Sequence, residues 1–149
     1  MKTLTLTVAL LATAFTLSPV ARAESLGNYE LRVEGRYDFH TWLWAMSTCG
    51  GSLESPEGCV HVLAIGRPIA KAFNYQGDAL LANGRYTLAV DVPDGLRCGD
   101  VYYGPVIPTR DVYSWDATTL VGTLESSFET GCDGAPGGTY TYPFTLSRL

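Results

Sequence analysis

Hydrophobic and polar residues alternate with a period of two along most of the chain. In the first such run, Tyr29, Leu31 and Val33 fall on one face, and charged residues fall on the other. The alternation continues there to residue 39, and it returns in residues 86–92, 120–128 and 140–146. Successive side chains point to opposite faces of a strand, so this pattern predicts half-buried β-strands and not helices.

Two further runs, residues 39–47 and 59–65, are apolar on both faces. They predict central strands with something packed on each side. Turn residues separate the runs. Asn83-Gly84 predicts a type I′ hairpin turn, because both residue types tolerate a positive φ. Residues 93–95, with the sequence Pro-Asp-Gly, predict another turn.

Other segments lack a clean strand pattern. Residues 99–111 contain Gly104, Pro105 and Pro108 and predict an irregular loop, and residues 133–138 predict a longer loop. Residues 68–81 fit two strands or a short helical turn. In the last run, Pro143 predicts an edge position or a backbone nitrogen that faces outward.

The runs amount to about eight short strands at near-regular spacing, which predicts an all-β, single antiparallel domain. No segment is rich enough in Pro, Gly or Ser to divide it. We expect a closed or nearly closed β-barrel with meander connections, because closure removes exposed strand edges. A two-sheet β-sandwich is the alternative.

The N-terminus has the pattern of a secretory signal peptide. Lys2 provides the positive charge, residues 4–17 are apolar apart from threonines, and Ala21-Arg22-Ala23 is a small-x-small cleavage site. The apolar run is shorter than the roughly 20 residues that a membrane-spanning helix needs. We therefore predict a signal peptide at residues 1–23 and an all-β domain at residues 24–149, either secreted or associated with the cell wall outside the membrane.

The charge of the chain limits the kinds of partner. There are 15 acidic and 10 basic residues, with a formal net charge of −5, and cleavage would remove two of the basic ones, Lys2 and Arg22. An acidic domain repels phosphate backbones and anionic membrane surfaces. We expect no nucleic-acid partner and no membrane association after cleavage.

Four cysteines, an even number behind a signal peptide, predict two disulfides. Of three possible connectivities we favour Cys49–Cys59 with Cys98–Cys132, because apolar runs on either side of a turn would bring the first pair together in one hairpin. The spacings are too wide for a structural zinc site, so no metal and no cofactor is expected.

The sequence contains no familiar catalytic motif. Both histidines, His40 and His61, fall inside predicted strands, where a packed or solvent-tipped role is common. We therefore expect a protein that is not an enzyme. A hydrolase whose site is not recognisable from sequence is the less favoured alternative.

Aromatic residues are the candidates for binding. Trp42 and Trp44 project from the same face of a strand, where they could stack on a sugar, line an apolar cavity or, as we favour, pack in the core. Tyr102, Tyr103 and Tyr113 fall in or near the predicted loop, where tyrosines make good partner contacts. Trp115 is expected to anchor that loop onto the barrel end.

Short motifs extend over nearly the whole chain after residue 23. They are Trp42, Cys49, Cys59-Val60-x-Val62, Asn83-Gly84-Arg85-Tyr86-Thr87-Leu88, Tyr113-Ser114-Trp115-Asp116-Ala117-Thr118-Thr119-Leu120-x-Gly122-Thr123, Cys132 and Pro143-Phe144-Thr145-Leu146. Together they resemble a group of small secreted mycobacterial proteins of unassigned function. The resemblance implies export, two disulfides and no established activity. Because the shared positions are strand, turn and disulfide residues, it implies a common fold more than a common site.

These observations predict an exported, disulfide-bonded binding module. Its ligand would be a small apolar molecule in a barrel mouth or a protein at the tyrosine-rich loop. The alternative is an envelope-associated inhibitor or interaction protein that uses residues 50–58 or 99–110 as a rigid loop.

Overall fold

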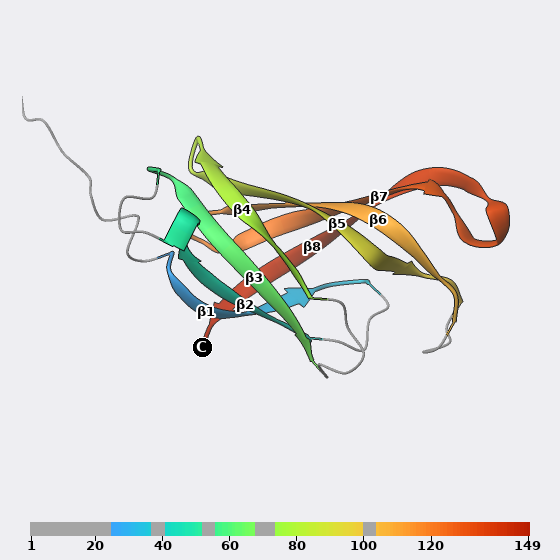
Figure 1. Ribbon diagram of the computed structural model, residues 1–149, viewed down its shortest axis with the longest axis horizontal. Coiled ribbons are helices and arrows are strands. Elements are labelled where there is room, and N and C mark those ends of the chain that lie inside the picture. The colour runs from blue at the N-terminus through green and yellow to red at the C-terminus, as the bar shows by residue number, and fades with distance from the viewer. Residues whose placement is uncertain (1–24, 37–40, 52–55, 68–73, 100–103) are drawn as a thin grey trace, which may run out of the picture.

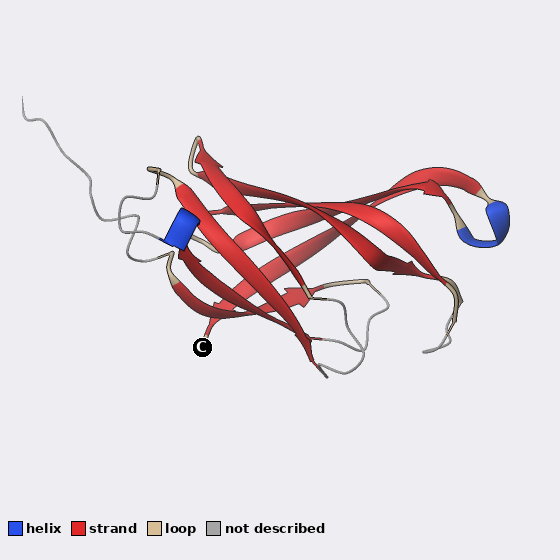
Figure 2. Ribbon diagram, viewed as in Figure 1, coloured by secondary structure: helices blue, strands red, loops and turns tan. Residues whose placement is uncertain are grey.

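The chain folds into one closed antiparallel β-barrel in which neighbouring strands follow chain order (Figure 1). The computed structural model describes residues 25–36, 41–51, 56–67, 74–99 and 104–149. Its strands are β1 (Gly27–Val33), β2 (Thr41–Thr48), β3 (Cys59–Arg67), β4 (Tyr75–Ala82), β5 (Arg85–Arg97), β6 (Val106–Asp116), β7 (Val121–Thr130) and β8 (Pro136–Arg148). Two short 3-10 turns, η1 (Cys49–Gly51) and η3 (Cys132–Gly134), are its helical elements (Figure 2). The predicted all-β barrel with about eight strands is confirmed, and the sandwich alternative is wrong.

Pairing of the first strand with the last closes the barrel. Tyr29 lies opposite Arg148, and the pairing runs to Val33 opposite Phe144. The Asn83-Gly84 turn between β4 and β5 also forms as predicted, with φ values of 51° and 75° and with Ala82 paired to Arg85 on either side.

Aromatic side chains fill the barrel interior. Trp44, Trp115, Tyr29, Tyr113 and Phe144 are among the largest fully buried side chains. Ring centroids lie 5.1 Å apart between Trp44 and Tyr113, and 5.4 Å apart between Trp44 and Trp115. The inward positions of Tyr29 and Phe144 follow the predicted alternation, because a strand of period two sends every second side chain into the barrel. No alternation was predicted for the segment that carries Tyr113 and Trp115, which forms part of β6.

The second half of the barrel is longer than the first. Strands β1–β4 have 7 to 9 residues, whereas β5–β8 have 10 to 13. The longer strands extend past the barrel body toward the right of Figure 1. We call this the open end, and the opposite end carries the β4–β5 turn and the C-terminus.

Several local predictions need correction. Residues 93–95 form no turn but lie within β5, where the register with β6 shifts between Val92 and Leu96. Residues 106–111 belong to β6 and not to a loop. Proline and glycine suggested breaks at both places, but pairing between β5 and β6 continues beyond the shift and keeps both segments extended.

Other corrections concern segment ends. β1 ends at Val33 and a bend follows, so the predicted strand to residue 39 is wrong over residues 34–36, while residues 37–39 lie outside the described residues. Residues 75–82 form strand β4, and β8 begins at Pro136 inside the predicted loop.

Pro143 lies where pairing of β8 with β1 ends, and its carbonyl accepts a hydrogen bond from the backbone N–H of Glu34 at 2.9 Å.

The prediction that something packs on both faces of β2 and β3 is wrong for their outer face. Among the residues that the structure describes, one strand layer forms the barrel wall, and the side chain of Leu63 keeps 37% of its surface exposed. Within the same residues, no helix has the length and apolar character needed to cross a membrane.

Candidate functional site

A cleft opens where β6 and β7 separate at the open end of the barrel. Their pairing stops at Arg110 opposite Ser127, although β6 continues beside β5 and β7 continues beside β8. The Ser127 hydroxyl donates to the Arg110 carbonyl at 3.2 Å, so the backbone polar groups of Arg110 face β7. Backbone polar groups alternate along a strand, so those of Pro108 also face β7. Because proline has no N–H, the next hydrogen bond between β6 and β7 cannot form.

A disulfide joins the two hairpins beyond the point where β6 and β7 separate. Cys98 at the end of β5 is bonded to Cys132 in η3, with Cα atoms 5.6 Å apart. The two hairpins, β5–β6 and β7–β8, are therefore paired along the barrel body, separate beyond Arg110 and Ser127, and are tied together again by this disulfide. The second disulfide, Cys49–Cys59, lies at the opposite end of the barrel, and both predicted pairings are confirmed.

The cleft has the size and composition of a small-molecule site. Its volume is about 740 Å³, within the range of roughly 300–1,000 Å³ that is usual for ligand pockets. Its lining residues are Asp91, Val92, Pro93, Ile107, Pro108, Thr109, Arg110, Ser127, Phe128, Glu129 and Thr130. The lining thus combines apolar side chains with hydroxyl groups. The charged residues form an exposed ion pair, Asp91 with Arg110 at 2.9 Å, and Glu129 adds a second acidic group.

Beneath the cleft lies a buried carboxylate. The Oδ1 atom of Asp111 accepts hydrogen bonds from the hydroxyls of Thr109 at 2.7 Å and Ser126 at 2.6 Å. Its Oδ2 atom pairs with the guanidinium of Arg36 at 3.4 Å, and Arg36 also donates to the Gly95 carbonyl. A buried charge is tolerated when a counter-charge and hydrogen bonds satisfy it. Thr109 belongs both to this network and to the cleft wall.

Gly95 supplies space for this network. A Cβ atom at residue 95 would collide with the Oγ1 and Cβ atoms of Thr109. Gly95 lies in the irregular part of β5, so the bulge brings its carbonyl to Arg36 without a side chain in the way.

A chain of hydrogen bonds continues from this network into the barrel. Trp44 Nε1 donates to the Tyr75 hydroxyl at 3.1 Å, and Tyr75 donates to the Tyr113 hydroxyl at 2.9 Å. Burial raises the pKa of Tyr75 well above its ordinary value, and Tyr113 adds to the effect. Burial, and then the charge of Asp111, raise the pKa of Tyr113. Both phenols are therefore neutral at physiological pH.

Most sequence-predicted binding residues lie away from the cleft. Trp42 and Trp44 are 7% and 0% exposed and belong to the core, as we favoured. Tyr113 lies in β6 and is 1% exposed, so its placement in or near a loop was wrong. Trp115 packs in the same core, stacked on Tyr86 at 5.3 Å, and does not anchor a loop.

Tyr102, Tyr103 and His40 lie outside the described residues. Asp111 and Phe128 were missed by the sequence reasoning. Asp111 points into the barrel, as do the alternate residues Thr109, Tyr113 and Trp115 of β6. An acidic residue at such a position would have been recognisable had residues 106–111 been assigned to a strand.

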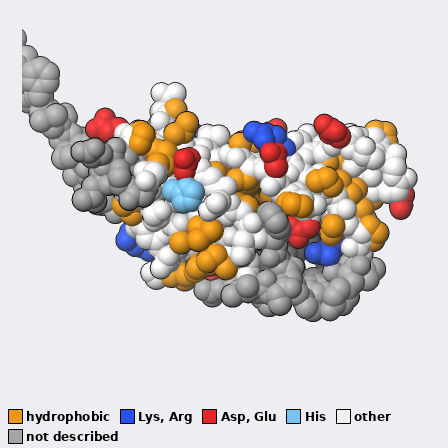
Figure 3. All heavy atoms as spheres, viewed as in Figure 1, with side chains coloured by type: hydrophobic (Ala, Val, Ile, Leu, Met, Phe, Trp, Pro, Cys, Tyr) orange, Lys and Arg blue, Asp and Glu red, His pale blue; other side chains and the backbone are white. Residues whose placement is uncertain are grey.

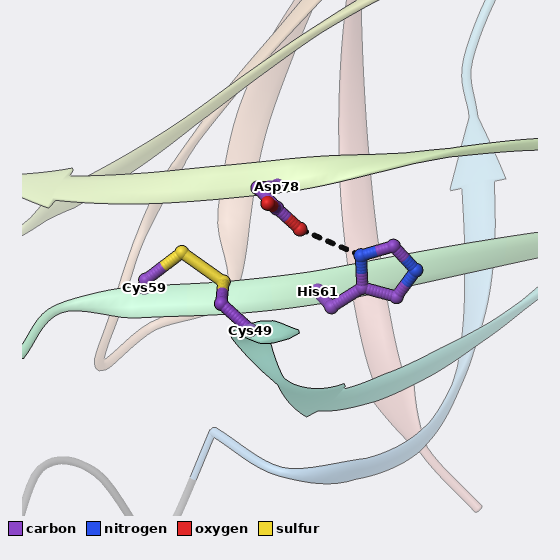
Figure 4. Close-up of a disulfide and its surroundings, with 4 residues drawn as sticks. All are labelled: Cys49, Cys59, His61 and Asp78. Carbon is purple, nitrogen blue, oxygen red and sulfur yellow. Dashed lines mark hydrogen bonds and ion pairs between the residues drawn. A yellow bond between two sulfur atoms is a disulfide. The ribbon is translucent and has the colours of Figure 1, made fainter. Parts of the chain in front are cut away.

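His61 lies on the outer surface near the other disulfide (Figure 4). Its Nδ1 atom is 2.6 Å from Oδ1 of Asp78, on the neighbouring strand, and both side chains are partly exposed. The ligand atoms of Cys49, Cys59 and Asp78 lie within 4.8 Å of one another. The two sulfur atoms are bonded to each other, so this group offers no thiolate to a metal ion.

Charge is scattered over the face drawn in Figure 3. Acidic and basic side chains occur singly or in small groups among neutral and hydrophobic ones, and no basic patch gathers there. This distribution offers no track for a phosphate backbone on that face.

These features define a class of protein: a single eight-stranded antiparallel barrel with a filled core, two disulfides and a cleft between two projecting hairpins. No protein-family model, curated protein or solved structure matches the chain. The resemblance to small secreted mycobacterial proteins therefore stays a prediction.

Proposed function

We propose that this is an extracytoplasmic, non-enzymatic binding protein that holds a small, largely apolar molecule in the cleft between its two hairpins. The observation that supports this proposal is the cleft of about 740 Å³ at the open end of the barrel. Since aromatic rings fill the barrel interior, the ligand would sit at the end of the barrel and not inside it.

The lining determines the chemistry of the ligand. Ile107 and Phe128 offer apolar surface for its body, while Thr130 offers an exposed hydroxyl group that orients a polar substituent. The hydroxyls of Thr109 and Ser127 already donate to Asp111 and to the Arg110 carbonyl. The charges at the cleft have both signs, so they do not select a strongly ionic ligand. An apolar molecule with one or two hydrogen-bonding groups fits this arrangement best.

A binding role suits the cleft better than catalysis. The Asp111 carboxylate beneath the cleft is already held by Thr109, Ser126 and Arg36. The neighbouring phenols of Tyr75 and Tyr113 are buried and neutral. A general base must lie within reach of its substrate, and all three of these groups are buried.

The two disulfides fit a protein that folds in an oxidising compartment. Together with the predicted signal peptide at residues 1–23, they support a site of action outside the membrane, either free or associated with the cell wall.

Native mass spectrometry of the protein purified from its own secreted fraction tests this proposal. We expect an added mass in the native sample that is absent from a denatured, non-reduced sample. Phe128→Ala and Ile107→Ala should each lower ligand occupancy by about tenfold or more, since they remove apolar contacts at the cleft.

Leu80→Ala is the matched control, because Leu80 is an apolar residue that is 60% exposed at the opposite end of the barrel. It should leave occupancy unchanged. An equal loss in the control, or a native sample without added mass, would overturn the small-molecule proposal. A native sample without added mass would direct the search to a protein partner.

A further inference from the structure

The first half of β8 has a backbone edge that no described strand covers. β1 pairs with β8 only from Phe144 to Arg148. The Pro143 carbonyl accepts from the N–H of Glu34, so the backbone polar groups of Pro143 face the β1 side. Backbone groups alternate along a strand, and therefore those of Thr139 and Thr141 face the same side. Beyond Pro143, no strand among the described residues lies there to meet them.

Between Pro136 and Pro143 this edge also lacks the usual protection. Residues 136–147 carry no charged side chain. Residues 136–141 are exposed, and Tyr140 keeps 48% of its surface accessible. Natural proteins usually blunt a free edge with charges, prolines or bulges, because an open edge is a template for another strand.

At the open end of the barrel, β5 also has a backbone edge without a paired strand, but that edge is protected. Pairing of β4 with β5 stops at Leu80 opposite Thr87, so β5 continues without a paired strand on that side. That part of β5 carries Asp91, Pro93 and Asp94, together with the bulge. One edge therefore has the features that prevent pairing, and the edge of β8 has none of them along residues 137–142.

We propose that the open edge of β8 pairs with the same edge of a second copy of this chain. The two strands would run antiparallel about a two-fold axis at Tyr140. In this register Thr139 lies opposite Thr141 of the second copy, and Thr141 lies opposite its Thr139. Both residues direct their backbone groups outward, so each such pair exchanges both N–H···O hydrogen bonds.

The side chains are self-complementary in this register. Tyr140 lies beside Tyr140 of the second copy, and aromatic cross-strand pairs stabilise a sheet. Tyr142 lies opposite Gly138, which has no side chain to obstruct the ring. Within one copy the ring centroids of Phe128 and Tyr140 are 5.4 Å apart, and those of Tyr140 and Tyr142 are 6.2 Å apart. The aromatic row would thus continue across the two-fold axis.

Charge favours a second copy at this edge over contact elsewhere. The chain has a formal net charge of −5, so most surfaces of two copies repel each other. The uncharged segment of residues 136–147 is a place where identical strands meet without like charges in register.

Sedimentation equilibrium of the secreted protein over a range of concentrations tests this proposal. We expect a reversible monomer–dimer equilibrium. The double variant Thr139→Lys with Thr141→Lys places like charges opposite each other in the dimer and should raise the dimer Kd by at least about tenfold. Thr139→Lys with Thr141→Glu places opposite charges there and should restore dimerisation.

The matched control is Thr87→Lys with Thr123→Lys, which changes two exposed threonines on the outer faces of β5 and β7. It should reduce dimerisation much less than the like-charged edge variant. Circular dichroism on every variant verifies that the barrel remains folded.

Three results would overturn the proposal: a monomeric wild-type protein at millimolar concentration, equal effects of the control and edge variants, or failure of the opposite-charge variant to dimerise. A monomeric protein that binds an added extended Thr/Tyr peptide would assign the edge to a peptide from another protein instead.

Discussion

Asp111 shows how one buried charge organises the open end of the barrel. Its carboxylate joins two strands and the segment after β1, because its partners are Thr109 on β6 itself, Ser126 on β7 and Arg36 just beyond the bend that follows β1. Gly95 of β5 completes the network through its carbonyl. One side chain therefore links the wall of the cleft to the segment that follows the first strand.

Replacing Asp111 by Asn should destabilise the protein strongly. The change removes a nearly buried counter-charge from Arg36, which costs about 3–5 kcal/mol for a buried ion pair. The matched change is Asp91→Asn in the exposed pair with Arg110, and it should cost less than about 1 kcal/mol. Urea unfolding at neutral pH measures both. Similar losses in the two variants would contradict the central role of Asp111.

At the scale of elements, the cleft results from an interrupted sheet. Pro108 removes a backbone donor toward β7, and the irregularity at Pro93 and Gly95 bends β5 away from regular pairing. Each hairpin is still held by its own ladder. The Cys98–Cys132 disulfide then fixes the separation of the two hairpin ends.

Removing the two disulfides separately should have different consequences. The sequence separations are 34 residues for Cys98–Cys132 and 10 residues for Cys49–Cys59. On the chain-entropy model, their removal as Cys→Ser pairs costs about 4 and about 3 kcal/mol. Only loss of Cys98–Cys132 should also weaken ligand retention in native mass spectra, since only that bond joins the two hairpins that form the cleft.

The variant without Cys49–Cys59 is the control in this comparison, because it also loses stability but lacks a disulfide at the opposite end of the barrel. Equal ligand retention in the two folded variants would show that the hairpin ends need no covalent link to shape the cleft.

At the scale of the whole molecule, closure of the barrel encloses one aromatic core. The rings of Trp44, Tyr113 and Phe144 are in mutual contact, and Tyr75 stacks on Tyr113 with centroids 5.8 Å apart. These residues come from four different strands. Exposing any of them to water therefore requires the barrel to open.

Alkaline pH should unfold the protein through two of these residues. The pKa values of Tyr75 and Tyr113 are raised by folding above the ordinary value of 10.0. Their contribution to stability is thus complete below pH 10 and is lost as the pH rises above it. We expect both phenols to ionise only together with unfolding, when phenolate absorbance and circular dichroism are followed side by side.

The double variant Tyr75→Phe with Tyr113→Phe provides the comparison for this titration. It should release two fewer phenolates in the unfolding step. Ionisation of all nine tyrosines while the circular dichroism of the folded barrel persists would contradict the assignment.

Local sequence patterns were sufficient for the strands with clear alternation and for the meander order. The alternation in β1, β5, β7 and β8 reflects a physical requirement, since each strand has one face in the core. The turn at Asn83-Gly84 and both disulfide pairings were likewise predictable. Breaker residues were misleading at residues 93–95 and 106–111, because hydrogen bonds from neighbouring strands outweighed the local turn preference.

The sequence by itself determined the all-β class and the meander order and favoured the observed pairing of the cysteines, because these depend on alternation, turns and spacing along the chain. Only the tertiary structure decided that the barrel is closed and filled, that Asp111 lies beneath a cleft, and that one edge of β8 stays open. Those features depend on which strands end early and which side chains meet across the barrel. Such contacts join residues far apart in the chain, as Arg36 and Asp111 are, and no local pattern records them.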